Sequence, residues 1–297
     1  GKHDSYNITM EQYDELLEYV KTRHFKMIRF TGGEPLLHRN IIDFIKKAKN
    51  LDLQTSIITN GYLLKMMSKK LVEAGLDQCI ISLDGSCSDI HDNLRNFKGC
   101  FDNIIFGIQE LRKYNKLIKI RINTVVSGRN IMDITNIYKL LLKLHINQWS
   151  IIPVKYKDNI WIPESFKYYD EFQKEIKNND DKQLEFLGDS KIFAGISNEE
   201  IFDTFNNNKR IKSKNICSVI DYVRFYIPDK NLLVPCNCIA HRLNQIPITM
   251  SGDMECDCEK IRQWLKLNCS KCTGSEPLNV YINDNPEIML DEENIRY

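Results

Sequence analysis

Apolar residues recur at two alternating spacings along the first half of the chain. Short apolar runs predict strands, and stretches with apolar residues three or four positions apart predict helices. The predicted strands lie at residues 27–30, 55–59, 79–83, 118–126 and 149–152. The predicted helices lie at residues 9–22, 41–48, 63–75, 101–114 and 131–145. Each of the first four strands is followed by a helix, and this repeat predicts right-handed βα units in a parallel sheet or barrel.

The regular alternation ends near residue 155. Residues 156–215 are polar and rich in Asn and Lys, which predicts a bridging segment with short helices. Further on, residues 222–227 and 232–234 are predicted to form a hairpin. We therefore divide the chain into a barrel domain at 1–155, the bridge at 156–215 and a small cysteine-rich α+β domain at 216–297.

Composition narrows the classes of protein to which the chain can belong. The 41 Lys and Arg residues nearly balance the 40 Asp and Glu residues, for a formal net charge of +1. This balance gives no reason to expect nucleic acid or an anionic membrane surface as a partner. The apolar runs are shorter than the roughly 18 residues that suggest a membrane span, and no secretory signal opens the chain. We expect a cytoplasmic protein.

Polar, glycine-containing turns follow three consecutive predicted strands. These turns are Gly32-Gly33-Glu34-Pro35, Thr59-Asn60-Gly61 and Ser82-Leu83-Asp84-Gly85. In a parallel α/β barrel, strand ends meet at one face, and the loops there carry the chemistry. Glycine lets a ligand approach the backbone closely, and the side-chain oxygens can accept hydrogen bonds from an ammonium group or from hydroxyls. Any one turn could be ordinary loop chemistry, but three in succession predict a ligand site.

These turns resemble the strand-end motifs of radical S-adenosylmethionine (SAM) enzymes. Gly32 to Pro35 is similar to the GGEP motif of that family, and the next two turns resemble its following two signatures. The stretch from His91 to Arg95, followed by Gly99-Cys100-Phe101, is similar to the HDxxR…GxF stretch common in peptide-modifying members. The similarity covers roughly residues 1–155. It continues through Asn123, Val126-Ser127-Gly128 and Ile152-Pro153.

The resemblance implies a partial (β/α)6 barrel that holds SAM, with its first strand upstream of residue 1. Arg95 is a candidate catalytic residue, and the alternative is a surface Arg paired with Asp92 on a loop. Glu34 would anchor the amine of SAM. The implied SAM contacts are Gly32, Gly33, Glu34, Pro35, Asn60, Ser82, Asp84, Asn123, Ser127 and Pro153.

The activity that the resemblance implies is reductive cleavage of SAM to a 5′-deoxyadenosyl radical, which abstracts hydrogen from a substrate. We expect a peptide substrate, as in a ribosomal peptide maturase. The alternative substrate is a small molecule such as a sugar or alcohol. An electron donor such as flavodoxin or ferredoxin is the implied partner.

One feature of the family is missing from these residues. Its catalytic [4Fe–4S] cluster is held by three cysteines spaced CxxxCxxC, and no such triad occurs among the ten cysteines. We expect that the triad was removed by truncation, so that the chain alone is inactive. A degenerate homologue that binds SAM or a peptide without radical chemistry is the alternative. An ordinary aldolase-type barrel would need a Schiff-base Lys or an acid–base pair at the strand ends, and the sequence offers no persuasive one.

Seven of the ten cysteines lie close together near the C-terminal end. They are Cys217, Cys236, Cys238, Cys256, Cys258, Cys269 and Cys272. In a cytosolic chain with a large core, such a cluster predicts metal binding instead of disulfides. The segment resembles the auxiliary-cluster modules called SPASM or twitch domains. That resemblance implies one auxiliary [4Fe–4S] cluster on Cys217, Cys236, Cys269 and Cys272, and a second would use Cys238, Cys256 and Cys258.

Structural zinc is the competing interpretation of the same cysteines. Cys256 and Cys258, together with Cys269 and Cys272, would make a tetrahedral site of four thiolates. Tetrathiolate geometry suits either metal, and the barrel motifs favour iron–sulfur. Outside this segment, Cys79 and Cys87 are expected to be packing residues.

Overall fold

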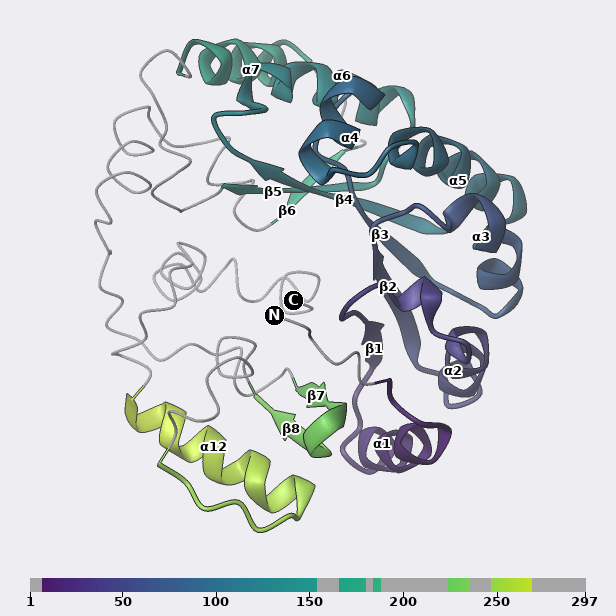
Figure 1. Ribbon diagram of the computed structural model, residues 1–297, viewed down its shortest axis with the longest axis vertical. Helices are drawn as coiled ribbons and strands as arrows, with labels where there is room; N and C mark the ends of the chain where they lie inside the picture. Colours follow the sequence, from purple (N-terminus) through teal and green to yellow (C-terminus); the bar gives the residue numbers. More distant parts are fainter. Residues whose placement is uncertain (1–6, 154–165, 180–183, 188–223, 236–246, 269–297) are drawn as a thin grey trace. The chain divides into compact units, whose positions relative to one another are not determined.

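The computed structural model describes residues 7–153, 166–179, 184–187, 224–235 and 247–268 (Figure 1). The chain divides into two compact units. One unit is Glu15–Asn208, and the other combines Gly1–Asp14 with Lys209–Tyr297. The domain boundaries predicted from the sequence, at residues 155 and 215, remain a prediction.

The larger unit contains a sheet of six parallel strands. The strands are β1 (Met27–Phe30), β2 (Gln54–Thr59), β3 (Gln78–Ser82), β4 (Lys119–Val126), β5 (Gln148–Pro153) and β6 (Glu185–Leu187). Each strand pairs with the next one along the chain. Figure 1 shows the strands in an arc with helices on its outer side, which is the arrangement of a partial (β/α) barrel. The predicted fold class is confirmed.

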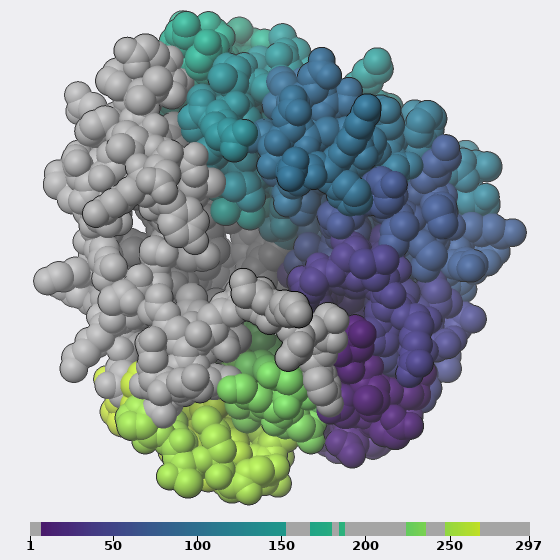
Figure 2. All heavy atoms as spheres, in the orientation of Figure 1, coloured from purple at the N-terminus to yellow at the C-terminus, as the bar shows by residue number. Residues whose placement is uncertain are grey.

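The helices are α1 (Met10–Thr22), α2 (Ile41–Lys49), α3 (Leu64–Glu73), α4 (Ser88–Arg95), α5 (Cys100–Tyr114), α6 (Ile134–Lys143) and α7 (Phe166–Asn178). Helices α1, α2, α3, α5 and α6 lie where the sequence pattern predicts helices, and α7 lies in the segment predicted as a bridge with short helices. Two 3₁₀ turns, η1 (Pro35–Leu37) and η2 (Ile131–Asp133), lie in the loops after β1 and β4. In the space-filling view, the described atoms of this unit run from purple to teal along the right and upper side of the picture (Figure 2).

The two faces of the sheet have different chemistry. The face toward the helices is apolar, because Ile57, Ile81, Ile122 and Trp149 are fully buried in one core with helix residues such as Ile104. Successive strand residues point to opposite faces, so the neighbouring positions line the inner face of the arc. That inner face is markedly polar.

A chain of hydrogen bonds crosses the inner face. Arg29 Nε donates to Ser56 Oγ (3.3 Å), and Ser56 Oγ donates to Gln78 Oε1 (3.2 Å). Gln78 Nε2 donates to Gln148 Oε1 (2.8 Å), and Gln148 Nε2 donates to Glu185 Oε2 (2.9 Å). We call these five side chains the inner polar ladder. It links strands β1, β2, β3, β5 and β6.

The described residues of the smaller unit that follow Lys209 form a hairpin with one helix. Strands β7 (Phe225–Ile227) and β8 (Leu232–Val234) pair antiparallel around the 3₁₀ turn η5 (Pro228–Lys230), as predicted. Helix α12 (Met254–Asn268) packs Ile261 and Leu265 against Leu232 and Val234. No helix in the described ranges of the whole chain is long and apolar enough to cross a membrane.

Three elements were missed in the sequence. Strand β6 has only three residues and lies in the segment predicted as a polar bridge. Residues 88–95 form helix α4, although this stretch was interpreted only as a motif. Helix α12 lies in the cysteine-rich segment, where we followed cysteine spacing instead of helical periodicity. The strand expected before residue 1 remains a prediction.

Candidate functional site

The turn after β1 leaves its backbone open. Gly32 has a φ of +130°, which glycine adopts far more readily than other residues. A Cβ built on Gly32 or Gly33 would meet no described atom within 4 Å. The two glycines are exposed at the carboxyl end of β1. This geometry leaves room for a ligand against the main chain.

Glu34 fastens this turn to the end of the neighbouring strand. Its Oε1 accepts hydrogen bonds from Leu36 N (3.0 Å) and Thr59 Oγ1 (2.7 Å). Its Oε2 accepts one from Asn60 N (2.7 Å). A carboxylate offers about four lone-pair positions, so about one remains for a ligand. Glu34 therefore acts first as a link between the β1 and β2 ends, and the predicted contact with the SAM amine has at most that position.

The turn after β2 is also fixed internally. Asn60 Oδ1 accepts from Tyr62 N (2.9 Å), and Asn60 O accepts from the Cys100 thiol (3.4 Å). Burial is the main reason that the pKa of Cys100 is raised to about 11. Gly61 has a φ of +82°, and a Cβ there would lie 2.5 Å from Ile104 Cγ1. The glycine is therefore required by packing against α5, while the side-chain oxygen of Asn60 closes the turn.

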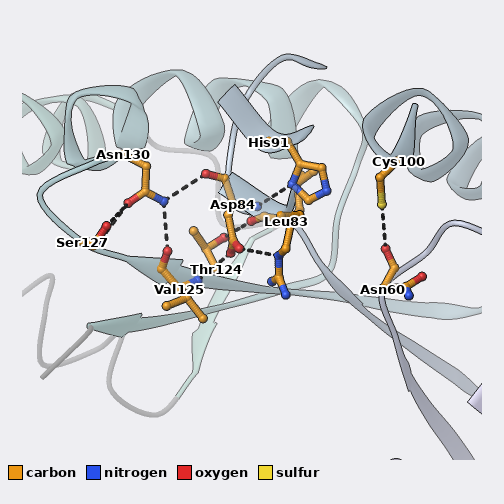
Figure 3. A network of polar contacts seen from close by, with 10 residues as sticks. Asn60, Leu83, Asp84, His91, Cys100, Thr124, Val125, Ser127 and Asn130 are labelled. Carbon is orange, nitrogen blue, oxygen red and sulfur yellow. Dashed lines mark hydrogen bonds and ion pairs between the residues drawn. The ribbon is translucent and has the colours of Figure 1, made fainter. Parts of the chain in front are cut away.

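Asp84, directly after β3, has a partner for every polar atom (Figure 3). Its N–H donates to His91 Nδ1 (3.0 Å), and its backbone oxygen accepts from Asn130 Nδ2 (3.0 Å). Its Oδ1 accepts from Val125 N (2.8 Å), and its Oδ2 pairs with Arg95 Nε (2.6 Å). Asp84 is only 6% exposed. Asp84 therefore joins the carboxyl ends of β3 and β4 through its own hydrogen bonds.

The loop after β4 completes this junction. Asn130 Oδ1 accepts from Ser127 N (2.8 Å), which closes the turn that contains the predicted site residue Ser127. Asp133 is buried and accepts from both Ser86 N (2.6 Å) and Ser86 Oγ (2.7 Å). The sequence analysis singled out none of Ser86, Asn130 and Asp133, because single polar residues in loops carry no periodic signal.

Two predicted site residues are neighbours on the inner face. Ser82 in β3 and Asn123 in β4 are register partners. Asn123 Oδ1 is buried and has no hydrogen-bond partner in the described part of the chain. Leaving a buried acceptor unsatisfied costs about 1–3 kcal/mol, and native structures rarely retain such a group without a reason. A ligand that donates a hydrogen bond here would remove this cost.

The HDxxR-like stretch is hydrogen-bonded both to Asp84 after β3 and to the start of α5. His91 is fully buried and accepts from Asp84 N, whereas Asp92 accepts from Gly99 N (2.6 Å) and Phe101 N (2.9 Å) at the start of α5. Arg95 is exposed, as the surface alternative expected, but its partner is Asp84 instead of Asp92 and it ends a helix instead of lying on a loop.

The other predicted SAM contacts lie at the same edge. Pro35 is buried as the first residue of η1. Pro153 ends β5 and is the register partner of Val126. The structure therefore brings the strand-end residues together, and their contacts with SAM remain a prediction.

Most of the predicted metal ligands lie outside the described residues. These are Cys217, Cys236, Cys238, Cys269 and Cys272. Within the described ranges, no group of three or more His, Cys, Asp or Glu residues could hold a metal ion. The predicted ligand set of the auxiliary cluster remains a prediction.

Cys256 and Cys258 do not face the same side of α12. Cys256 is exposed and Cys258 is 3% exposed. Residues two positions apart are about 200° apart around a helix. The sites that would use both thiols, for a second cluster or for zinc, remain predictions. Cys79 is buried as expected, whereas the expectation that Cys87 packs is wrong, because it is exposed.

Comparison with known proteins shows which protein family the strand-end region is similar to. The model of the Radical SAM superfamily matches residues 1–141. The matched region is just under half of the chain, and it contains the strand-end turns that resemble this superfamily. Solved structures share the fold of the chain. The chain aligns with Streptococcus suis SuiB bound to S-adenosylmethionine at a TM-score of 0.62 and 14% identity, covering 94% of this chain and 66% of SuiB.

A second solved neighbour is native anSMEcpe with bound AdoMet and Cp18Cys peptide. It aligns at a TM-score of 0.58 and 16% identity, covering 96% of this chain and 91% of that chain. At these identities the likeness shows the fold alone.

Curated relatives match part of the barrel. The AdoMet-dependent heme synthase of Methanosarcina barkeri (strain Fusaro / DSM 804) is 30% identical over 138 residues, which are 46% of this chain and 39% of that protein. The GTP 3',8-cyclase of Helicobacter pylori (strain ATCC 700392 / 26695) is 41% identical over 118 residues, 38% of this chain and 36% of that protein. The matched regions span less than half of either relative.

Proposed function

We propose that this chain is the SAM-binding barrel of a radical SAM enzyme that modifies a ribosomally made peptide. The buried, unpartnered Oδ1 of Asn123 carries the SAM-binding part of this proposal. It lies on the inner face, at the carboxyl edge where the open Gly32-Gly33 turn also lies. SAM offers an ammonium group and two ribose hydroxyls, which are the kinds of donor that this oxygen lacks.

The residues present fit SAM at this edge. Gly32 and Gly33 leave space for a close approach to the backbone. Glu34 retains about one acceptor position for the amine, in accordance with the lone pairs of a carboxylate. Ser82 lies beside Asn123 and adds a hydroxyl for the ribose or the methionine end. Asp84, in contrast, supports the loop through its own partners.

The family chemistry requires a [4Fe–4S] cluster that supplies the electron for cleavage of SAM to a 5′-deoxyadenosyl radical. Its CxxxCxxC ligands are not among these 297 residues. The protein residues described above would orient SAM and hold the edge rigid, while the cofactor supplies the difficult chemistry. We further propose at least one auxiliary cluster in the cysteine-rich segment, and a flavodoxin or ferredoxin as electron donor.

The peptide substrate is supported by the solved neighbours that cover most of the chain. SuiB has been solved bound to its precursor peptide SuiA, and anSMEcpe with a Cp18Cys peptide. A small-molecule substrate is the second candidate, because the curated relatives include a GTP 3',8-cyclase and a heme synthase.

The first test is SAM binding by the chain of 297 residues, measured by equilibrium dialysis with labelled SAM. Asn123→Ala should weaken binding by about tenfold, the scale of one buried hydrogen bond. Asn50→Ala is the control, since Asn50 is exposed at the end of α2, on the opposite side of the sheet from the site. Absence of saturable SAM binding, or equal losses in both variants, would refute the SAM site.

The second test concerns catalysis by the complete protein after anaerobic reconstitution with iron and sulfide. Formation of 5′-deoxyadenosine is expected, and a peptide substrate should increase its rate. SAM binding without nucleoside formation would instead support the non-catalytic alternative. Turnover of a sugar or alcohol with no response to peptides would support the small-molecule alternative.

A further inference from the structure

His91 is unusual among the residues of the carboxyl edge. It is fully buried, and its ring accepts a hydrogen bond at Nδ1 from the backbone of Asp84. Because Nδ1 is the acceptor, the neutral ring carries its proton on Nε2. Nε2 is itself buried, without a hydrogen-bond partner in the described ranges. None of these contacts requires a charged imidazole.

The bond from Asp84 N to His91 belongs to a set that fixes the β3 end completely. Asp84 is held by α4 through His91 and Arg95, by β4 through Val125, and by the following loop through Asn130. Leu83 N also donates to Asn123 O (3.0 Å), so the strand segment that presents Asn123 is joined to the same junction. A shift of Asp84 would therefore move the edge on which Asn123 lies.

We propose that His91 is a positioning residue for SAM, which in its neutral form clamps Asp84 and keeps the β3 and β4 ends in the binding conformation. This inference rests on the proposed function for its ligand. Protonation of Nδ1 would place a donor against the Asp84 N–H, and the hydrogen bond could not form. SAM affinity should then depend on the protonation state of a side chain that does not touch SAM.

The charges around His91 set the pH range of this dependence. Burial lowers its pKa, and the Arg95 guanidinium acts in the same direction, whereas the Asp84 and Asp92 carboxylates oppose this shift. The Cys100 thiol on α5 stays protonated, because its pKa is raised to about 11. His91 is therefore neutral at pH 7, and the clamp weakens only as the pH falls through this lowered pKa, which lies below the ordinary histidine value of about 6.5.

Two substitutions separate the clamp from general loss of structure. His91→Asn keeps an acceptor at the δ position but cannot titrate, whereas His91→Gln places its oxygen at the ε position, away from Asp84. Wild-type SAM affinity should be about tenfold lower at a pH that protonates His91 than at pH 7, the scale of one lost buried hydrogen bond. His91→Asn should bind SAM equally at both pH values, and His91→Gln should be about tenfold weaker at both.

The control is His145→Asn, at an exposed position with a φ of 51° that Asn tolerates. It should keep the wild-type pH profile. An identical pH profile for wild type and His91→Asn would overturn the proposal. If wild type binds no SAM at any pH, the proposed function fails. Hydrogen exchange of the backbone amides of residues 83–87 then tests whether His91 holds Asp84 in place. Exchange at pH 7 should be faster in His91→Gln than in His91→Asn, and equal rates would refute the clamp.

Discussion

Two carboxylates at the sheet edge, Glu34 and Asp84, each accept a backbone hydrogen bond from a neighbouring strand end. Glu34 accepts from Asn60 N, and Asp84 accepts from Val125 N. Charged acceptors make stronger hydrogen bonds than neutral ones. These two residues, which resemble SAM ligands in sequence, therefore also hold successive strand ends at fixed distances.

This dual role predicts a measurable loss of stability at Glu34. Glu34→Gln replaces one acceptor oxygen by an amide that cannot accept from Thr59 or Asn60. The free energy of unfolding should fall by about 1–3 kcal/mol, as measured by urea denaturation, and SAM binding should weaken with it. Glu73→Gln is the control, because Glu73 forms only an exposed pair with Lys69. Its cost should stay within about 0.5 kcal/mol, and equal costs would contradict the linking role.

At the residue scale, the sequence predicted which residues lie in the strand-end turns better than it predicted their hydrogen-bond partners. The Gly, Asn and Asp residues of the turns were identified because turn chemistry has a local signature. The contacts of Glu34 with Thr59 and of Asp84 with Asn130 join residues 25 and 46 positions apart. Such pairings depend on strand order and register, which a single sequence does not reveal.

At the scale of elements, α4 explains the HDxxR…GxF stretch as a connector. Gly99 is the N-cap of α5 with a φ of +78°, and it has no side chain to cap the helix. Asp92 supplies the missing acceptors for Gly99 N and Phe101 N. The same helix directs His91 and Arg95 toward Asp84. A short helix thus joins the β3 end to the start of α5.

Removing the Asp92 carboxylate, which caps the start of α5 from helix α4, should destabilise the protein. Asp92→Ala leaves two helix N–H groups without acceptors and should cost about 1–2 kcal/mol of unfolding free energy. Asp102→Ala is the matched control, since it removes the same charge from the first turn of α5 at an exposed position. Thermal or urea denaturation would compare them. A cost for Asp102→Ala as large as that for Asp92→Ala would show that helix charge, and not capping, is responsible.

Most helices and strands of the barrel were predictable because their periodicity is strong. Strand β6 has too few residues for a pattern, and its pairing with β5 depends on register. Helix α12 does carry a helical pattern, with Cys258, Ile261 and Leu265 three or four positions apart and all buried. Cysteine spacing alone obscured that signal, and it also suggested a shared site for two thiols on opposite sides of the helix.

At the scale of the whole molecule, the cysteine-rich segment has a direct test of metal content. The proposed auxiliary cluster predicts that the Cys269→Ala and Cys272→Ala double variant loses iron and sulfide together after anaerobic reconstitution. Cys87→Ala should leave both unchanged, because Cys87 is an exposed thiol in the larger unit. Zinc without sulfide in the wild-type chain would instead support the structural zinc alternative.

The inner polar ladder has a consequence for how such barrels can be recombined. Its donors and acceptors alternate from Arg29 to Glu185, so each member is matched to the side chain on another strand. A chimera that imports a β3 strand without a glutamine at position 78 would lose the hydrogen bonds of Gln78 to Ser56 and Gln148. Exchange would succeed only in blocks that carry the complementary residues together. The barrel interior thereby restricts which segments evolution, or a protein engineer, can transfer independently.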